Sequence, residues 1–130
     1  MVSLRGFLVA GLLIASVFWG WDRGITRDGL VRFIDRNPKL WKADTILFTL
    51  GSFHELFNRN ERALDIYGRV VKAYPKSPLA DDALFGVAAC QERLKRWAEA
   101  TEHYKAYLEK YPNGKYSASV SKNLEYLRSR

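Results

Sequence analysis

The sequence has few of the residues that usually build metal and redox sites. Its 130 residues include one cysteine, Cys90, and two histidines, His54 and His103. A single cysteine excludes an intramolecular disulfide framework and a cysteine-rich zinc site. The two histidines fall on different predicted helices, so they do not form the i, i+4 pair that holds a metal ion on one helix face. We therefore expect no metal site. We expect Cys90 to be buried, His54 to lie in the core or in a groove, and His103 to be largely solvated.

Catalytic motifs are also missing. The chain contains no glycine-rich phosphate loop and no Gly-x-Ser-x-Gly nucleophile motif. Its adjacent aspartates, Asp81 and Asp82, come just before an apolar helical pattern, and negative charge is favourable in the first turn of a helix. The sequence therefore predicts that the protein is not an enzyme and that it has no catalytic residues and no cofactor.

Positive charge exceeds negative charge, and the excess is concentrated near the N-terminus. The net charge is +7 and the pI is about 9.7. Residues 1–42 contain seven Lys and Arg against three Asp and Glu, a net charge of +4, whereas residues 43–130 contain fourteen against eleven, a net charge of +3. A nucleic-acid-binding domain would place a basic stripe on its folded part, and none is evident, so we expect no nucleic acid partner. The N-terminal charge instead suggests that anionic lipid head groups contact Arg23, Arg27 and Arg32.

An uncharged apolar segment, Phe7–Trp21, follows Arg5. As a helix its 15 residues span about 22 Å, which is shorter than the hydrocarbon layer of about 30 Å and would suit a cleaved export signal. Signal cleavage, however, needs small residues at spacings that this segment does not offer, and tryptophans stand at its polar edge, as they do in spanning helices. We therefore favour an uncleaved single-pass anchor over residues 1–22, and we expect these residues in the membrane: Phe7, Leu12, Leu13, Ile14, Phe18, Trp19 and Trp21.

The orientation of this anchor stays open. Arg5 and the terminal amine favour a cytoplasmic N-terminus, whereas Arg23, Arg27 and Arg32 on the other flank favour the opposite orientation. A following domain of this length can cross the membrane despite its charges. Both orientations therefore remain alternatives, and so does cleavage of the apolar segment.

The rest of the chain is organised around a repeat of 37 residues, in which Asp44–Pro75 and Asp81–Pro112 follow the same pattern. A fixed period of this size predicts stacked helical hairpins, each of which leaves an apolar face for its neighbour to cover. The matched positions are Leu47 with Leu84, Leu50 with Val87, Gly51 with Ala88, Ala63 with Ala100, Tyr67 with Tyr104, and Tyr74 and Pro75 with Tyr111 and Pro112.

The repeated unit resembles the tetratricopeptide repeat. That family has a small residue in the first helix, then alanine and an aromatic residue four positions later in the second helix, and a closing proline. Two features depart from its pattern: the period exceeds the usual length of about 34 residues, and His54 and Gln91 stand where the family has tyrosine. The connector over residues 74–83 is similar to the junctions of bacterial envelope repeat proteins of the barrel-assembly and Tol-associated coordinator type.

Hydrophobic periodicity predicts an all-α fold. Pro38 lies 37 residues before Pro75, so a juxtamembrane helix within residues 23–39 would take the place of the second helix of a preceding repeat. The alternative is an amphipathic helix lying on the bilayer. Residues 40–130 would form two hairpins and a capping helix. The expected helices are Ile25–Asn37, Leu40–Phe57, Glu61–Tyr74, Leu79–Leu94, Trp97–Tyr111 and Tyr116–Arg128.

The resemblance also implies a site, because the first helices of tetratricopeptide repeats line a concave groove that binds a partner helix or an extended peptide. Phe48 and Phe85, 37 residues apart, would grip an apolar side chain of that partner, or each would pack against the neighbouring unit. The groove residues implied by the resemblance are Thr45, Phe48, Ser52, Glu55, Asp82, Phe85, Ala89 and Glu92.

Together these patterns predict a membrane-anchored scaffold or adaptor that binds another protein, as an accessory or assembly subunit of a membrane complex. The connector similarity favours the bacterial inner membrane, with the repeat domain in the periplasm. Two alternatives remain: a soluble periplasmic adaptor released by signal cleavage, and a module that binds a lipid surface through its arginines.

Overall fold

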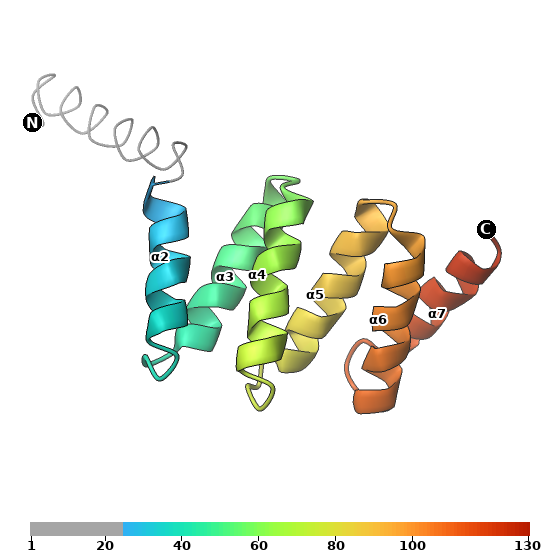
Figure 1. Ribbon diagram of the computed structural model, residues 1–130. Coiled ribbons are helices and arrows are strands. Elements are labelled where there is room, and N and C mark those ends of the chain that lie inside the picture. The colour runs from blue at the N-terminus through green and yellow to red at the C-terminus, as the bar shows by residue number, and fades with distance from the viewer. Residues whose placement is uncertain (1–24) are drawn as a thin grey trace, which may run out of the picture. The chain divides into compact units, whose positions relative to one another are not determined.

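The computed structural model describes the backbone of residues 25–130 and the side chains from residue 29 onward. Within this range the chain is all-α (Figure 1). The expected anchor over residues 1–22, its seven membrane residues and Arg23 lie outside the described residues. No helix within residues 25–130 is long and apolar enough to cross a bilayer. The described helices are α2 (Ile25–Arg36), α3 (Ala43–Leu56), α4 (Asn60–Ala73), α5 (Ala80–Arg93), α6 (Trp97–Lys110) and α7 (Ser117–Arg128).

The chain divides into two compact units, of which the first ends at Leu40 and the second is Trp41–Arg130. In the first unit, α2 buries Val31 and Ile34 and exposes Arg32. Its helix ends before Asn37, whose side-chain amide donates to the Phe33 carbonyl at 2.8 Å. The described end of α2 therefore lies one residue before the predicted end.

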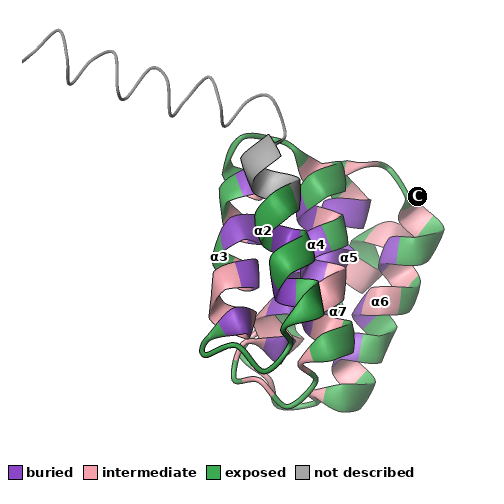
Figure 2. Cartoon of the chain, turned by 60° about the vertical axis from the view of Figure 1, so that its left-hand side comes forward, coloured by how far each residue is buried: buried purple, intermediate pink, exposed green. Residues whose placement is uncertain are grey.

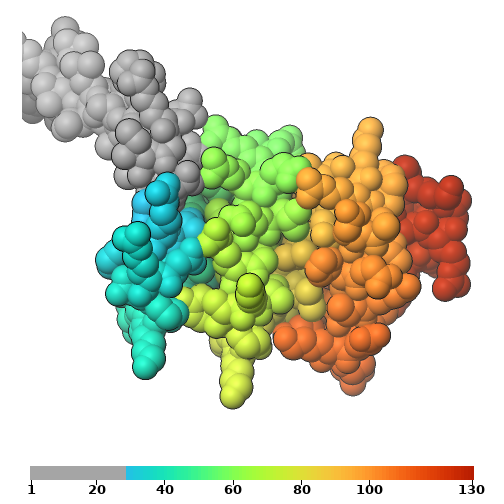
Figure 3. Space-filling model, viewed as in Figure 1, coloured from blue at the N-terminus to red at the C-terminus, as the bar shows by residue number. Residues whose placement is uncertain are grey.

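The second unit is a stack in which each helix from α3 to α7 packs against the next. The helices alternate in direction, so α3 with α4 and α5 with α6 form antiparallel hairpins, and α7 follows as a single helix (Figure 1). In the space-filling view, α4 and α6 form much of the face toward the viewer (Figure 3). The expected arrangement of two hairpins followed by one helix is thus present in the structure.

Both hairpin turns have a residue with a left-handed backbone at the same position of the repeat. Asn58 after α3 has a φ of 56°, and Lys95 after α5 has a φ of 60°. In the first turn the Arg59 N–H reaches the His54 carbonyl at 2.9 Å, and the second turn repeats this bond 37 residues later. This 6→1 bond, together with the 5→2 bond beside it, is the Schellman motif, which supplies partners for the last carbonyls of a helix.

The connectors between hairpins also repeat. The Ser77 N–H donates to the Tyr74 carbonyl at 3.0 Å, and the Gly114 N–H donates to the Tyr111 carbonyl at 3.0 Å. After α2, the Leu40 N–H makes the same bond at 2.9 Å, again 37 residues earlier. The sequence period therefore extends to the turn that follows α2.

One helix start differs from the sequence prediction. We expected a helix from Leu40, but α3 begins at Ala43. Lys42 has a φ of 59°, in the left-handed region, and a residue with that backbone cannot belong to a right-handed helix. The other described helix ends lie within one residue of those predicted.

The core is built from small residues and tyrosines along the repeat. Ala63 and Ala100 are fully buried at equivalent positions of the two hairpins. A Cβ atom added at Gly51 would lie 2.7 Å from one edge of the Tyr67 ring, and one added at Gly86 would lie 2.7 Å from the other edge. The ring therefore lies between α3 and α5, and the two glycines leave the room for it. Buried residues follow the inner sides of the helices in Figure 2.

The second hairpin and α7 share one apolar cluster, formed around Tyr104 and Tyr107. Val120 of α7 is fully buried in it, and Leu124 and Leu127 pack at its border. The apolar face of the expected capping helix therefore packs on the second hairpin. Its burial shields α6 from water, as the terminal element of a repeat array must.

Candidate partner-binding groove

The eight groove residues implied by the sequence lie on α3 and α5, and all are half-buried. They occupy equivalent positions in the two hairpins, 37 residues apart, but their side chains are not equally free. Ser52, Glu55, Asp82 and Glu92 form hydrogen bonds within the protein. Partner binding at this groove stays a prediction. The residues on α3 are Thr45, Phe48, Ser52 and Glu55, and those on α5 are Asp82, Phe85, Ala89 and Glu92.

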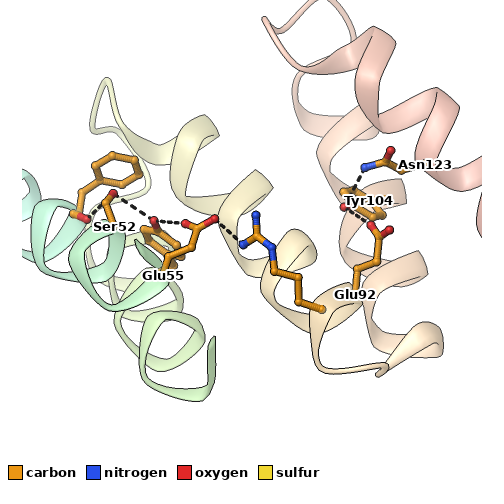
Figure 4. Close-up of polar contacts among 8 residues, drawn as sticks. Ser52, Glu55, Glu92, Tyr104 and Asn123 are labelled. Atoms are coloured by element: carbon orange, nitrogen blue, oxygen red, sulfur yellow. Dashed lines mark hydrogen bonds and ion pairs between the residues drawn. The ribbon is translucent and has the colours of Figure 1, made fainter. Parts of the chain in front are cut away.

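Glu55 is the centre of a network that joins the two hairpins (Figure 4). The Tyr67 hydroxyl donates to its carboxylate at 2.7 Å, and Arg93 of α5 forms an ion pair with the other oxygen. The Tyr67 hydroxyl also lies 3.1 Å from the hydroxyl of Ser52, which itself donates to the Phe48 carbonyl. Glu55 therefore links α3, α4 and α5, and its charge is already balanced by Arg93.

The second hairpin repeats the central bond of this network. The Tyr104 hydroxyl donates to the Glu92 carboxylate at 2.7 Å and accepts the Asn123 amide of α7 at 3.0 Å (Figure 4). Burial raises the pKa of both Tyr67 and Tyr104, and the adjoining carboxylates, Glu55 and Glu92, raise it further. Both phenols therefore stay protonated at neutral pH and act as donors to the groove carboxylates.

The two phenylalanines have different environments. The Phe48 ring lies 5.4 Å from the Tyr67 ring, centroid to centroid, in a tilted arrangement. The Phe85 ring stacks on Tyr116, with centroids 4.1 Å apart and planes inclined by 7°. Tyr116 also donates its hydroxyl to Asp82 at 2.6 Å. For Phe85 the structure thus shows packing against the following element, which was one of the two alternatives.

A hollow lies at the starts of α3 and α5. It was not predicted from the sequence. Its volume is about 540 Å³. The indole of Trp41 at its edge is 82% exposed. The available signal was a tryptophan placed just before a helix, outside the repeated apolar pattern. The residues that line it are Trp41, Lys42, Asp44, Thr45, Pro78 and Leu79.

Of the isolated polar candidates, His54, Gln91 and Cys90 lie in the core, and His103 does not. His54 and Gln91 occupy equivalent positions on α3 and α5 and are buried. Cys90 is fully buried, and burial raises the pKa of its thiol to about 11, which disfavours the reactive thiolate. His103 is half-buried rather than largely solvated, with its Nδ1 3.0 Å from the Glu99 carbonyl. Among the described residues, no group of three or more His, Cys, Asp and Glu could hold a metal ion.

A comparison with protein families found a match to the helices of the two hairpins. A model described as tetratricopeptide repeat matches residues 56–115, which run from the end of α3 through α6. Residues 56–115 are similar to a tetratricopeptide repeat. No curated protein matches the chain. The match supports the tetratricopeptide family for the repeated hairpins, and this family suggests a scaffold for protein–protein interaction.

Proposed function

We propose that this protein is a membrane-anchored scaffold that holds another protein at the bilayer through its tetratricopeptide hairpins. It would serve as an accessory or assembly subunit of a membrane complex and would perform no chemistry itself. The observation that carries the proposal is the tetratricopeptide match over residues 56–115, on hairpins that stack through α7. Such hairpins expose an extended surface rather than an enclosed reaction centre.

The carboxylates of the groove already accept hydrogen bonds within the protein, which favours recognition of the partner through apolar contacts. Glu55 and Glu92 accept hydrogen bonds from buried tyrosines, and Asp82 accepts one from Tyr116. A partner would have to displace these donors to use the carboxylates, and an unpaired buried group costs about 1 to 3 kcal/mol. We therefore expect the partner to contact exposed apolar surface and free charges at the rim.

The membrane part of the proposal rests on the sequence alone. Phe7–Trp21 is uncharged, and seven Lys and Arg lie within residues 1–42. We propose a single N-terminal pass in a bacterial inner membrane, with the hairpins in the periplasm. Release by signal cleavage and binding to a lipid surface through Arg23, Arg27 and Arg32 are the competing proposals.

Fractionation of cells that produce the full chain with a C-terminal tag tests the membrane proposal. We expect the tagged chain in the membrane after carbonate washing, with its first residue intact on N-terminal sequencing. A mature chain that starts near residue 17 to 25 would support the cleaved adaptor instead. Protease added to spheroplasts should remove the C-terminal tag if the hairpins are periplasmic.

Purification in mild detergent tests the scaffold proposal. We expect the full chain to retain a partner at a defined stoichiometry, because stacked repeats present an extended surface that can bind another protein. The matched variants are Phe48→Ala, which alters the groove, and Thr49→Ala, which alters an exposed position of the same helix. A partner that binds wild type and both variants equally would contradict the use of this groove.

A further inference from the structure

The last helix, α7, is polar at the positions where a following helix would pack. On α5 these positions are buried, and two of them lie in the apolar cluster that α5 shares with α6. One period later, on α7, all three positions are exposed. The free side of α7 therefore suits contact with water. The residues are Leu84, Ala88 and Gln91 on α5, and Ser121, Glu125 and Arg128 on α7.

The first described helix, α2, shows the opposite pattern. Leu30 is 39% exposed and Phe33 is 53% exposed. One period later the same positions hold Tyr67 and Val70, which are 2% and 0% exposed. In the second hairpin both positions are fully buried. Thus α2 exposes an apolar face that the second helix of each hairpin buries.

On α4 this face is covered by the first helix of the same hairpin. The Tyr67 hydroxyl donates to Glu55 of α3 at 2.7 Å, and the Phe48 ring of α3 lies 5.4 Å from the Tyr67 ring. In both hairpins the first helix begins 17 residues before the second. A helix that covers α2 in the same way would therefore lie shortly before α2 in the chain.

A segment of suitable length and composition stands at that place. Residues 6–19 lie one period before α3, outside the described residues, and none of them is charged. The buried positions Leu47, Leu50 and His54 of α3 all correspond to apolar residues in this segment. The corresponding residues are Ala10, Leu13 and Val17.

Contacts between helices change in pairs from one repeat to the next. In the first hairpin, Glu55 accepts the Tyr67 hydroxyl, and Asp44 accepts the Ser77 hydroxyl of the connector. One period earlier both members of each pair are apolar, so no polar group would be left without a partner. The apolar pairs are Phe18 with Leu30 and Phe7 with Leu40.

The sizes of facing residues change together as well. Gly51 leaves room for the Tyr67 ring, since an added Cβ atom would lie 2.7 Å from it. One period earlier the larger Ile14 faces Leu30, which is smaller than tyrosine. The exchange keeps one small and one large partner from becoming two large rings or two small gaps.

These matches select the occupant of the α2 face. Insertion of the segment in a bilayer would explain its own apolar residues, but it would not explain why Leu30, Phe33 and Leu40 are exposed and apolar. A helix that packs on them explains both. The short connection to α2 also gives the segment an effective concentration on the order of mM, which a separate partner does not reach.

We propose that residues 6–19 pack on α2 as the first helix of a third hairpin whenever a bilayer does not hold them. The chain itself then covers Leu30, Phe33 and Leu40. This goes beyond the scaffold function, because it gives the apolar segment two locations. The α2 face becomes free when the bilayer takes up the segment.

Cysteine cross-linking in the full chain, synthesised without lipid or detergent, tests the proposal. The pair Ile14→Cys and Leu30→Cys corresponds to Gly51 and Tyr67, which are in contact. In the control pair, Arg32→Cys replaces Leu30→Cys, because Arg32 is exposed and lies on the opposite side of α2. We expect oxidation to join the first pair and not the second, as read by peptide mapping. Failure of the first pair to join would overturn the proposal.

Thiol labelling gives a second measurement that needs no cross-link. The single variant Leu30→Cys should react slowly with a maleimide in the absence of lipid, because the segment covers it. The Arg32→Cys variant should react fast, and unchanged circular dichroism of both variants shows that the helices are formed. Equal rates for the two variants would contradict the proposal. Joining of an Ile14→Cys chain to a separate Leu30→Cys chain after mixing would assign the face to a second copy instead.

Synthesis in the presence of phosphatidylglycerol and phosphatidylethanolamine vesicles separates this proposal from the membrane anchor. In the chain that floats with the vesicles, we expect the cross-link to be lost and Leu30→Cys to label as fast as Arg32→Cys. If the cross-link forms there as well, the packing on α2 stands and the spanning anchor is wrong. If it forms in neither sample, the packing is wrong, and the anchor and the scaffold function are unaffected.

Discussion

At the residue scale, one aromatic ring sets how closely the two hairpins approach. Tyr67 of α4 lies between Gly51 of α3 and Gly86 of α5, and a Cβ atom at either glycine would lie 2.7 Å from the ring. Its hydroxyl is fixed by Glu55 at 2.7 Å, so the ring cannot move away without losing that bond. A glycine inside a helix normally reduces stability, and here the close approach of the ring explains why it is present.

Substitution of these glycines tests this explanation. Gly86→Ala gains about 1 kcal/mol of helix propensity, but overpacking against the ring should cost about 1 to 3 kcal/mol, so we expect lower stability overall. Gly68→Ala is the matched control, because Gly68 is also inside a helix and has nothing within 4 Å of an added Cβ. That variant should gain up to about 1 kcal/mol. Urea unfolding of both variants measures the difference, and equal gains would show that the ring yields without cost.

The sequence could not reveal the role of Gly86, because repeat comparison pairs it with Thr49 rather than with another small residue. The comparison instead paired Gly51 with Ala88, and both of these small residues are buried in the structure. Arg93 was missed for a similar reason. Its ion pair with Glu55 joins residues 38 positions apart, and Arg93 looks like an ordinary surface charge in its own helix.

At the scale of elements, the hairpin turns show what the period predicts and what it leaves out. The period predicts a turn after each first helix, and both turns have the same hydrogen bonds. It does not predict that the left-handed position holds Asn58 in one hairpin and Lys95 in the other. Asparagine tolerates this backbone through local hydrogen bonds, whereas lysine has no such compensation.

Replacement of the left-handed residue should therefore affect the two hairpins differently. Lys95→Gly removes a steric penalty of about 1 to 2 kcal/mol and costs part of it in chain entropy, so we expect a gain of roughly 0.5 to 1 kcal/mol. Asn58→Gly should change stability less. Thermal unfolding of both variants measures the difference, and a loss of stability in Lys95→Gly would show that its side chain contributes more than its backbone costs.

For the groove, too, the sequence predicted the position of the residues but not all of their contacts. The resemblance placed eight residues on one side of α3 and α5, and the structure shows each of them half-buried on those helices. The resemblance did not show that Tyr116 stacks on Phe85, because that contact depends on a residue outside both repeated segments. The hollow was not predicted because the two repeats differ there, and the sequence prediction was based only on positions at which they are similar.

At the scale of the whole molecule, buried phenols and one buried thiol are spread over both hairpins. Burial raises the pKa of Tyr67 and Tyr104 above 10.0, and it raises the pKa of Cys90 from 9.0 to about 11. Each group holds its proton more tightly in the folded chain than in the unfolded chain. The stability contributed by these protons is therefore complete below about pH 9 and is lost as the pH rises through the folded pKa values.

We accordingly expect the free energy of unfolding to fall with increasing pH above about pH 9, while it stays nearly constant between pH 7 and 9 with respect to these groups. Urea unfolding at a series of pH values measures the fall. The Cys90→Ala variant should lose the part of the pH dependence between about pH 9 and 11, although it is less stable at every pH because Cys90 is fully buried. An unchanged pH dependence in this variant would contradict the assignment to Cys90.

The hollow at the starts of α3 and α5 also has a consequence for how such a protein could be lengthened. Internal duplication of one 37-residue unit would copy α5, α6 and their connector, yet it would not copy the hollow, because the new junction would inherit Tyr116 rather than Leu79. A longer array would thus gain length without gaining a second hollow. A second hollow of this kind would require substitutions of its own at the new junction.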